Sequence, residues 1–187
     1  MKSNPEVAPI HEAAFYNQIN EVRAFIKAGL SPNFRAKNGM NALHFALAHG
    51  NMACAKVLLK AGAKLGPRGK GAKEALITAS AHGYLKPLKY LLANGVSPNC
   101  KNQRGWTPLH FAAMEQGHSY VSIVRTLLNF GANPKLKGLS GQTPLALLHE
   151  FMDGPSTLAE DLPFYKKKIR LLEKNLNAGR MRIRKKN

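Results

Sequence analysis

A step of 33 residues is the feature of this sequence that most restricts its fold. An aliphatic residue recurs at Ile10, Leu43, Leu76 and Leu109, and the series continues at Leu145 after a step of 36 residues. Glycines that follow an apolar pair or near pair keep the same steps: Gly29, Gly62, Gly95 and Gly131. A period between about 20 and 50 residues indicates a repeat array, in which each repeat buries its apolar face only against its neighbours.

The clearest copy of the repeat predicts two helices joined by a short turn. Thr107 is suited to cap a helix, and Pro108 then occupies the first helical position, where its missing N–H costs nothing. A second helical pattern begins near Val121 and runs to Gly131, which is placed to adopt the left-handed conformation that ends a helix. Each repeat is therefore expected to be a helix, a turn and a second helix, followed by an exposed loop.

The string Gly-x-Thr-Pro-Leu-His-x-Ala-Ala, with a second helix ending in Leu-Leu and Gly-Ala, resembles the ankyrin repeat. The resemblance implies an all-α solenoid of stacked helix-turn-helix repeats with short finger loops. It is strongest over residues 105–132 and weakest in the third copy, residues 73–79, which lacks Thr-Pro and His. The motif positions are Leu43, His44, Leu76, Thr107, Pro108, Leu109, His110, Thr143, Pro144 and Leu145. In this family the motif histidine hydrogen-bonds to the backbone around a neighbouring finger, which is the role expected of His44 and His110.

The repeat boundaries divide the chain into seven consecutive segments. They are a flexible N-terminus (1–5), an N-terminal capping repeat (6–33), repeats 2 to 4 (34–66, 67–99 and 100–134), a degenerate C-terminal capping repeat with an insertion (135–177), and a basic tail (178–187). A two-residue insertion in repeat 4 predicts a protruding loop at 118–120. One continuous array accounts for the chain, and a monomer is expected.

The charge of the chain is not explained by a repeat fold. The sequence has 28 Lys and Arg against 10 Asp and Glu, a formal net charge of +18, and residues 22–114 contain fourteen basic residues and one acidic residue, Glu74. Such a field attracts polyanions and raises association rates. The alternative is that the charge serves only solubility.

The resemblance also implies which residues contact a partner, because ankyrin proteins use their finger tips and the exposed face of the first helix. The residues at those places are Arg35, Lys37, Met40, His49, Arg68, Lys70, Lys73, His82, Lys101, Arg104, Trp106, Met114 and Phe151. They predict a basic concave groove with aromatic or apolar ends, in which Trp106 is the expected anchor because aromatic residues dominate interface energies. Trp106 has the alternative role of covering the neighbouring finger. Phe15 and Tyr16 stay open between partner contact and core.

The closing segment is expected to be a helix over residues 164–176 that ends before Gly179. Tyr165, Ile169, Leu172 and Leu176 form its apolar stripe, and a polar outer face is assigned to Lys166, Lys167, Lys168, Arg170 and Lys174. The basic tail contains Arg180, Arg182, Arg184, Lys185 and Lys186. Such a run directs nuclear import, contacts nucleic acid, contacts anionic lipid or stays solvated, and these alternatives remain open.

Other chemistry is not indicated. No Ser, His and Asp arrangement, paired carboxylates or phosphate-binding loop is recognisable, so no enzyme and no cofactor are expected. His49 and His82 lack a third ligand at sensible spacing, and Cys54 and Cys100 form no metal-ligand pattern. The sequence has no membrane-spanning run and no signal-peptide pattern. The expected location is intracellular, in the cytoplasm with entry to the nucleus, and the architecture also fits a bacterial effector acting in a host cell.

The function expected from these observations is a non-enzymatic protein-binding module, an adaptor or effector, whose basic groove binds an acidic segment of a partner protein. The alternative is a protein that binds nucleic acid or another polyanion through the groove and the tail. Contact with an anionic membrane surface ranks below both.

Overall fold

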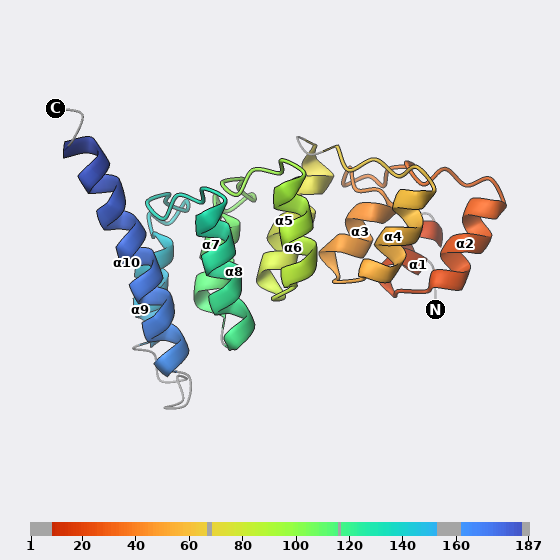
Figure 1. Ribbon diagram of the computed structural model, residues 1–187. Helices are drawn as coiled ribbons and strands as arrows, with labels where there is room; N and C mark the ends of the chain where they lie inside the picture. Colours follow the sequence, from red (N-terminus) through yellow and green to blue (C-terminus); the bar gives the residue numbers. More distant parts are fainter. Residues whose placement is uncertain (1–8, 67–68, 116, 153–161, 185–187) are drawn as a thin grey trace. The chain divides into compact units, whose positions relative to one another are not determined.

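The computed structural model describes residues 9–66, 69–115, 117–152 and 162–184 (Figure 1). These residues form helices joined by turns and loops, and they include no β-strand. The chain divides into two compact units, which we call the N-terminal unit (Met1–Ser97) and the C-terminal unit (Pro98–Asn187). The predicted flexible N-terminus, residues 1–5, lies outside the described residues.

The N-terminal unit is built from consecutive antiparallel helix pairs. Its helices are α1 (Pro9–Phe15), α2 (Ile19–Lys27), α3 (Ala42–Ala48), α4 (Met52–Lys60), α5 (Lys70–Ala81) and α6 (Leu85–Ala93). Within each pair the helices contact each other, and α1 packs on α3, α3 on α5 and α2 on α4. Every pair therefore buries its apolar face against the next one, as the repeat period predicts.

The turn inside each pair depends on a left-handed backbone position. Gly50 has a φ of 80° and Gly83 a φ of 71°, and each directly follows the cap residue that ends α3 or α5. Asn17, with a φ of 59°, stands at the same place after α1. Asparagine is among the few residues that tolerate this region, so the first repeat makes its turn without a glycine.

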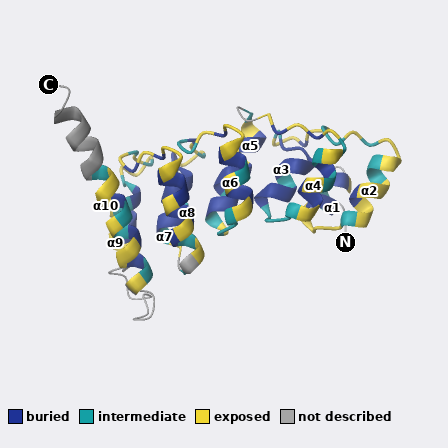
Figure 2. Cartoon of the chain, in the orientation of Figure 1, coloured by how far each residue is buried: buried dark blue, intermediate teal, exposed yellow. Residues whose placement is uncertain are grey.

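The core of the N-terminal unit combines leucine with alanine. Leu43, Leu47 and Leu76 are fully buried, and so are Ala46 and Ala75 on the same helices. Alanine lets the helices approach closely while leucine fills the remaining space. Figure 2 shows the buried stretches running along α3 and α5, with exposed residues in the loops and along α2.

The C-terminal unit contains two further repeats, of which the second ends in a long helix. Its helices are α7 (Pro108–Met114), α8 (His118–Asn129), α9 (Pro144–Met152) and α10 (Leu162–Arg184). Helix α7 packs on α8 and α9, while α10 packs on both α8 and α9. Helix α10 therefore packs across both repeats of this unit.

Two sequence predictions about this unit are wrong. The insertion in repeat 4 does not make a protruding loop at 118–120; these residues begin α8, which has 12 residues where α4 and α6 have 9. Helix α10 does not end before Gly179 but continues to Arg184. One glycine costs a helix about 1 kcal/mol, and the good helix formers around it, such as Ala178 and Arg180, carry the helix past that position.

Candidate functional site

Neighbouring repeats are joined by histidines that hydrogen-bond to backbone. His44 accepts from the Asn41 N–H through Nδ1 (3.0 Å), and its Nε2 lies 2.6 Å from the Leu65 carbonyl oxygen in the following loop. The Asn41 side chain accepts from the His44 N–H at 3.1 Å, which completes a reciprocal cap at the start of α3. Burial, together with the positive charge of Arg35, lowers the pKa of His44 to about 4. The ring is therefore neutral at physiological pH and acts as a structural brace.

The same brace occurs in the C-terminal unit and at the start of the chain. His110 accepts from the Thr107 N–H at 3.1 Å and contacts the Gln142 carbonyl oxygen at 3.2 Å through Nε2. His11, which the sequence analysis left without a role, contacts the Phe34 carbonyl oxygen at 2.9 Å. The signal for His11 is present in the sequence, because Pro9-Ile10-His11 matches Pro108-Leu109-His110 in type and order.

The loop that precedes α3 and the start of α5 bring basic side chains together in the N-terminal unit. Arg35 donates from Nη1 to the Gly39 carbonyl oxygen at 2.8 Å. A Cβ placed on Gly39 would lie 3.7 Å from the Cβ of Lys70, so Lys70 stands next to the same loop. Lys37 lies on this loop and Lys73 one turn further along α5. All four side chains are exposed, and we call Arg35, Lys37, Lys70 and Lys73 the basic cluster.

The basic cluster forms because the backbone at the start of α5 lies in contact with the loop that precedes α3. A Cβ on Gly71 would lie 2.7 Å from the Gly39 carbonyl oxygen and 3.0 Å from the Met40 Cα, closer than side chains tolerate. Gly71 is therefore required at this position. The helix also begins with Gly69 at its N-cap, where no side chain caps it, in agreement with the missing Thr-Pro motif of the third copy.

Met40 does not fit the predicted partner-binding set. The residue is only 4% exposed, and Gly71 at the start of α5 lies against its Cα. His49 is half-buried and His82 exposed, and both stand at the C-caps of their helices, α3 and α5. Arg68 lies outside the described residues.

In the C-terminal unit the predicted contact residues are divided between surface and internal packing. Lys101, Arg104 and Phe151 are exposed, and Lys101 donates from Nζ to the Lys137 carbonyl oxygen at 3.1 Å. Trp106 is half-buried, and a Cβ on Gly138 would lie 2.6 Å from its ring. The tryptophan thus covers the next finger, which is the alternative role considered for it. Met114 is half-buried at the end of α7.

Helix α10 contains a buried lysine, Lys168. The sequence predicts Lys168 on the polar outer face of this helix, which is wrong, because its side chain is fully buried. Its Nζ donates to the carbonyl oxygens of Ala112 (3.3 Å), Ala113 (2.5 Å) and Glu115 (2.5 Å) at the end of α7. It also lies 4.9 Å from the centre of the Tyr165 ring. Burial lowers the pKa of Lys168 to about 7, while the Glu115 charge opposes this.

The basic tail cannot be placed as a surface. Arg180, Arg182 and Arg184 belong to the last turns of α10, but their side chains lie outside the described residues, as do Lys185 and Lys186. Their role stays a prediction. The single groove predicted from Arg35 to Trp106 also stays a prediction, because its residues belong to two separate units.

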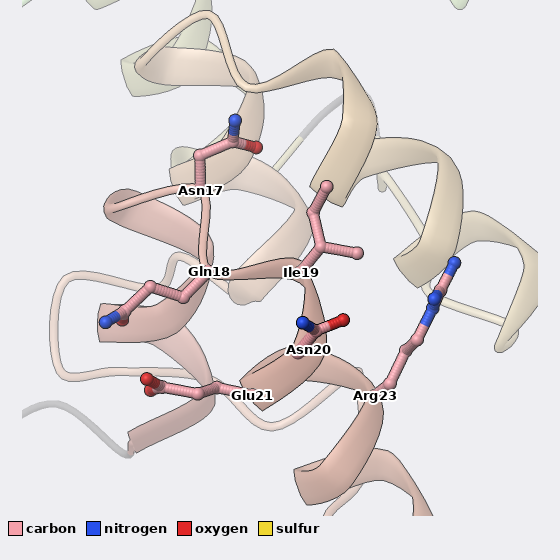
Figure 3. Close-up of a pocket in the computed structure, with 6 residues that line it drawn as sticks. All are labelled: Asn17, Gln18, Ile19, Asn20, Glu21 and Arg23. Carbon is pink, nitrogen blue, oxygen red and sulfur yellow. The ribbon is translucent and has the colours of Figure 1, made fainter.

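A hollow lies beside the turn between α1 and α2. It is lined by Asn17, Gln18, Ile19, Asn20, Glu21 and Arg23. Figure 3 shows Gln18 and Glu21 on one side and Arg23 directed to the other, so these polar groups do not converge on one ligand position. The hollow therefore lacks the arrangement of a small-molecule site.

The described residues hold no group of three or more His, Cys, Asp or Glu side chains suited to a metal ion. Cys54 and Cys100 are both buried, and burial raises the pKa of the Cys54 thiol. Within the same residues, no helix combines the length and the apolar character needed to cross a membrane.

Comparison with protein families agrees with the geometry of these repeats. A family profile described as ankyrin repeats (3 copies) matches residues 2–69 and 76–150. A comparison with curated proteins gives no match. The matched segments cover most of the chain and include the histidine braces, whereas the first half of α5 and all of α10 lie outside them. The predicted all-α fold class is confirmed, and the chain belongs to the ankyrin-repeat family.

Proposed function

We propose that this protein binds an acidic segment of a partner protein through the basic cluster of its N-terminal unit. Ankyrin repeats are protein–protein interaction modules, so the class of function follows from the family. The acidic character of the partner is the new element. The observation that supports it is that the loop carrying Arg35 and Lys37 lies in backbone contact with the start of α5, which carries Lys70 and Lys73.

The rigid setting of the cluster supports binding of a defined segment. Arg35 is held by its hydrogen bond to Gly39, so part of the entropy that a free arginine loses on binding is already lost. The guanidinium presents several donors in a fixed fork that suits carboxylates. Residues 22–114 include one acidic residue, Glu74, so little negative charge within this stretch competes with the partner.

Binding of nucleic acid or another polyanion is the second function that the charge supports. The formal net charge of +18 favours any polyanion. An affinity for arbitrary single-stranded DNA that falls steeply with salt, and that exceeds the affinity for an acidic polypeptide at physiological salt, would favour this alternative. A salt titration of binding to poly-glutamate, run in parallel, separates the two functions, because an acidic-segment binder should prefer poly-glutamate at physiological salt.

The decisive experiment is a charge reversal with a matched control. The test variant is Arg35→Glu/Lys70→Glu, and the control is Lys56→Glu/Lys60→Glu on α4, where both lysines are exposed. The two variants have the same net charge. We expect the test variant to bind fluorescein-labelled poly-glutamate about tenfold more weakly or worse, and the control to change little, because contacts between close charges dominate over the general field.

Equal losses in the two variants would show that only net charge matters, and the proposal of a specific cluster would fail. Thermal melts of both variants are needed alongside the binding curves, because an unfolded test variant imitates a lost contact. All four substituted residues are exposed, so the control should melt close to the parent protein. The test variant also loses the hydrogen bond from Arg35 to Gly39 and should melt a few degrees lower.

A further inference from the structure

A row of aromatic and imidazole rings crosses the N-terminal unit at the ends of α1, α3 and α5. Phe15 lies 4.8 Å from Tyr16 and 4.0 Å from His49, measured between ring centroids. His49 lies 6.3 Å from His82, and His82 stacks on Tyr84 at 5.8 Å. We call these five residues the ring row. It links three successive repeats within one unit.

The ring row is built into the repeat rather than placed on it by chance. His49 and His82 are 33 residues apart, and both are the C-cap residues before the left-handed glycines Gly50 and Gly83. The ring of Tyr84 lies against Gly50, where an added Cβ would come within 2.9 Å of it. His82 is held by a hydrogen bond of 2.9 Å between its Nδ1 and the Thr78 carbonyl oxygen. The backbone therefore fixes the ring positions.

Much of the ring row is exposed. Tyr16 is 55% exposed and Phe15 is 37% exposed, although both carry a large aromatic ring. His82 is exposed, while His49 and Tyr84 are half-buried. The core of the first repeat is completed without these rings by Ile10 and Ala14. Burial, followed by the nearby His82, lowers the pKa of His49, which favours the neutral form of its ring.

We infer that the ring row is a second recognition strip, which binds aromatic or other apolar side chains of the same acidic partner segment. The inference rests on the proposed function. An extended segment that places carboxylates on the basic cluster and apolar side chains on the ring row would match both surfaces of this unit. Exposed aromatic side chains that do not complete a core are typical of protein interfaces.

The orientation of the rings favours a polypeptide over nucleic acid. Phe15 is inclined by 69° to Tyr16 and by 45° to His49, and His49 by 50° to His82. Successive bases bind to ring faces that are open for stacking. Three of the four neighbouring ring pairs are therefore steeply inclined, and only His82 and Tyr84 are nearly parallel, at 10°. Most of the row thus offers ring edges and inclined faces, which suit packing of aliphatic and aromatic side chains.

The test compares two acidic polymers of matched length, poly-glutamate and a random glutamate–tyrosine copolymer in a ratio of about 4:1. We expect the protein to bind the copolymer about fivefold more tightly or better, since one aromatic contact contributes about 1 kcal/mol. The variant Tyr16→Ser/His82→Ser should lose this preference and keep its affinity for poly-glutamate. The control Phe130→Ser/Leu139→Ser removes two exposed apolar side chains of the C-terminal unit and should keep the preference.

The outcomes separate the inference from the proposed function. If neither polymer binds, both fail. If both polymers bind equally to the parent protein, or if the serine variant keeps the preference, the ring row is not a recognition strip and only the inference is overturned. If single-stranded oligothymidine displaces the copolymer at physiological salt and loses its affinity in the serine variant, the row belongs to nucleic acid and the inference is likewise overturned. Phe15→Leu, which keeps an apolar contact with His49 but removes the ring, should reduce the preference without lowering the melting temperature.

Discussion

The first helices of the repeats, α3 and α5 in the N-terminal unit and α7 in the C-terminal unit, end in different ways. In the N-terminal unit, α3 and α5 end at His49 and His82, whose rings join a partly exposed row. In the C-terminal unit, the carbonyl oxygens at the end of α7 accept hydrogen bonds from Lys168, which is fully buried. The braces that join the repeats are nevertheless the same, His44 in one unit and His110 in the other. The joint between repeats is therefore constant, while the helix ends differ: exposed rings in one unit, closure by α10 in the other.

The largest effect is expected from removing the buried lysine. Lys168→Ala should destabilise the C-terminal unit by about 3 to 5 kcal/mol, because the carbonyl groups of Ala112 and Ala113 would remain buried without their donor. Amide hydrogen exchange in α7 and α10 measures the loss. The neighbouring exposed Lys167 provides the control Lys167→Ala, which should change stability by less than about 0.5 kcal/mol. Similar losses in the two variants would mean that Lys168 does not close this unit.

The two units should also differ in their dependence on pH. His44 and Lys168 are bases whose pKa values are lowered on folding, from 6.5 to about 4 and from 10.5 to about 7. Between its two values each group is protonated in the unfolded chain and neutral in the folded one, so stability rises with pH in that window. Because of His44, the free energy of unfolding of the N-terminal unit should rise by up to about 3 kcal/mol from pH 4 to pH 6.5, at about 1.4 kcal/mol per pH unit. Lys168 should act in the C-terminal unit between pH 7 and pH 10.5.

The measurement is the free energy of unfolding, obtained from urea titrations at a series of pH values. Amide hydrogen exchange assigns the unfolding to one unit or the other. The His44→Gln variant should reduce the acid dependence of the N-terminal unit but not abolish it, because burial also lowers the pKa values of His11 and His49 in this unit. The exposed His149→Gln control should leave it unchanged. The Lys168→Met variant should flatten the alkaline window of the C-terminal unit. If the stability of the parent protein fell as the pH rose from 7 to 10, the ammonium form would be the favoured buried form and this prediction would be wrong.

The smallest effect is expected at the glycines that follow the second helix of a repeat, which occur in both units. Gly62 and Gly131 end α4 and α8 with φ values of 84° and 86°, and neither has an atom within 4 Å of an added Cβ. Substitution by alanine therefore adds only backbone strain, expected to be about 1 kcal/mol in each unit. Parallel denaturation of Gly62→Ala and Gly131→Ala checks whether the two values agree. A difference above about 1 kcal/mol would show that the joints are not equivalent.

The sequence alone predicts the repeated elements well and the exceptions poorly. The 33-residue step, Pro108 and the glycines after the second helices identify the helix pairs because they reflect local backbone geometry. Lys168 was misplaced because periodicity and polarity disagree at this position. It lies on the apolar side of α10, one turn after Tyr165, but its charge suggested the outer face. Only the position of the α7 carbonyl groups, which is tertiary information, decides the matter.

The candidate site shows the same division. The family pattern selected His49, His82, Arg35 and Lys70 individually, but a pattern of positions does not reveal that Gly71 brings α5 against the Gly39 backbone. That contact places α5 against the Met40 backbone and sets Lys70 beside the loop of Arg35. The 33-residue step relates Tyr16 to His49 and His82, but Phe15 and Tyr84 occupy other places in their repeats, and only the ring distances join these two to the row.

The hydrogen bonds between repeats end on main-chain atoms. Asn33 donates from Nδ2 to the Gly62 carbonyl oxygen (3.0 Å) and accepts from the Lys64 N–H (2.7 Å), and Asn99 makes the corresponding bonds to Gly131 and Asn133. Every polypeptide supplies such amides and carbonyls, whatever its side chains. Neighbouring modules are thus free to diverge, duplicate or be exchanged by recombination while the coupling between them persists, which makes an array of this kind a ready substrate for evolving or engineering new binding surfaces.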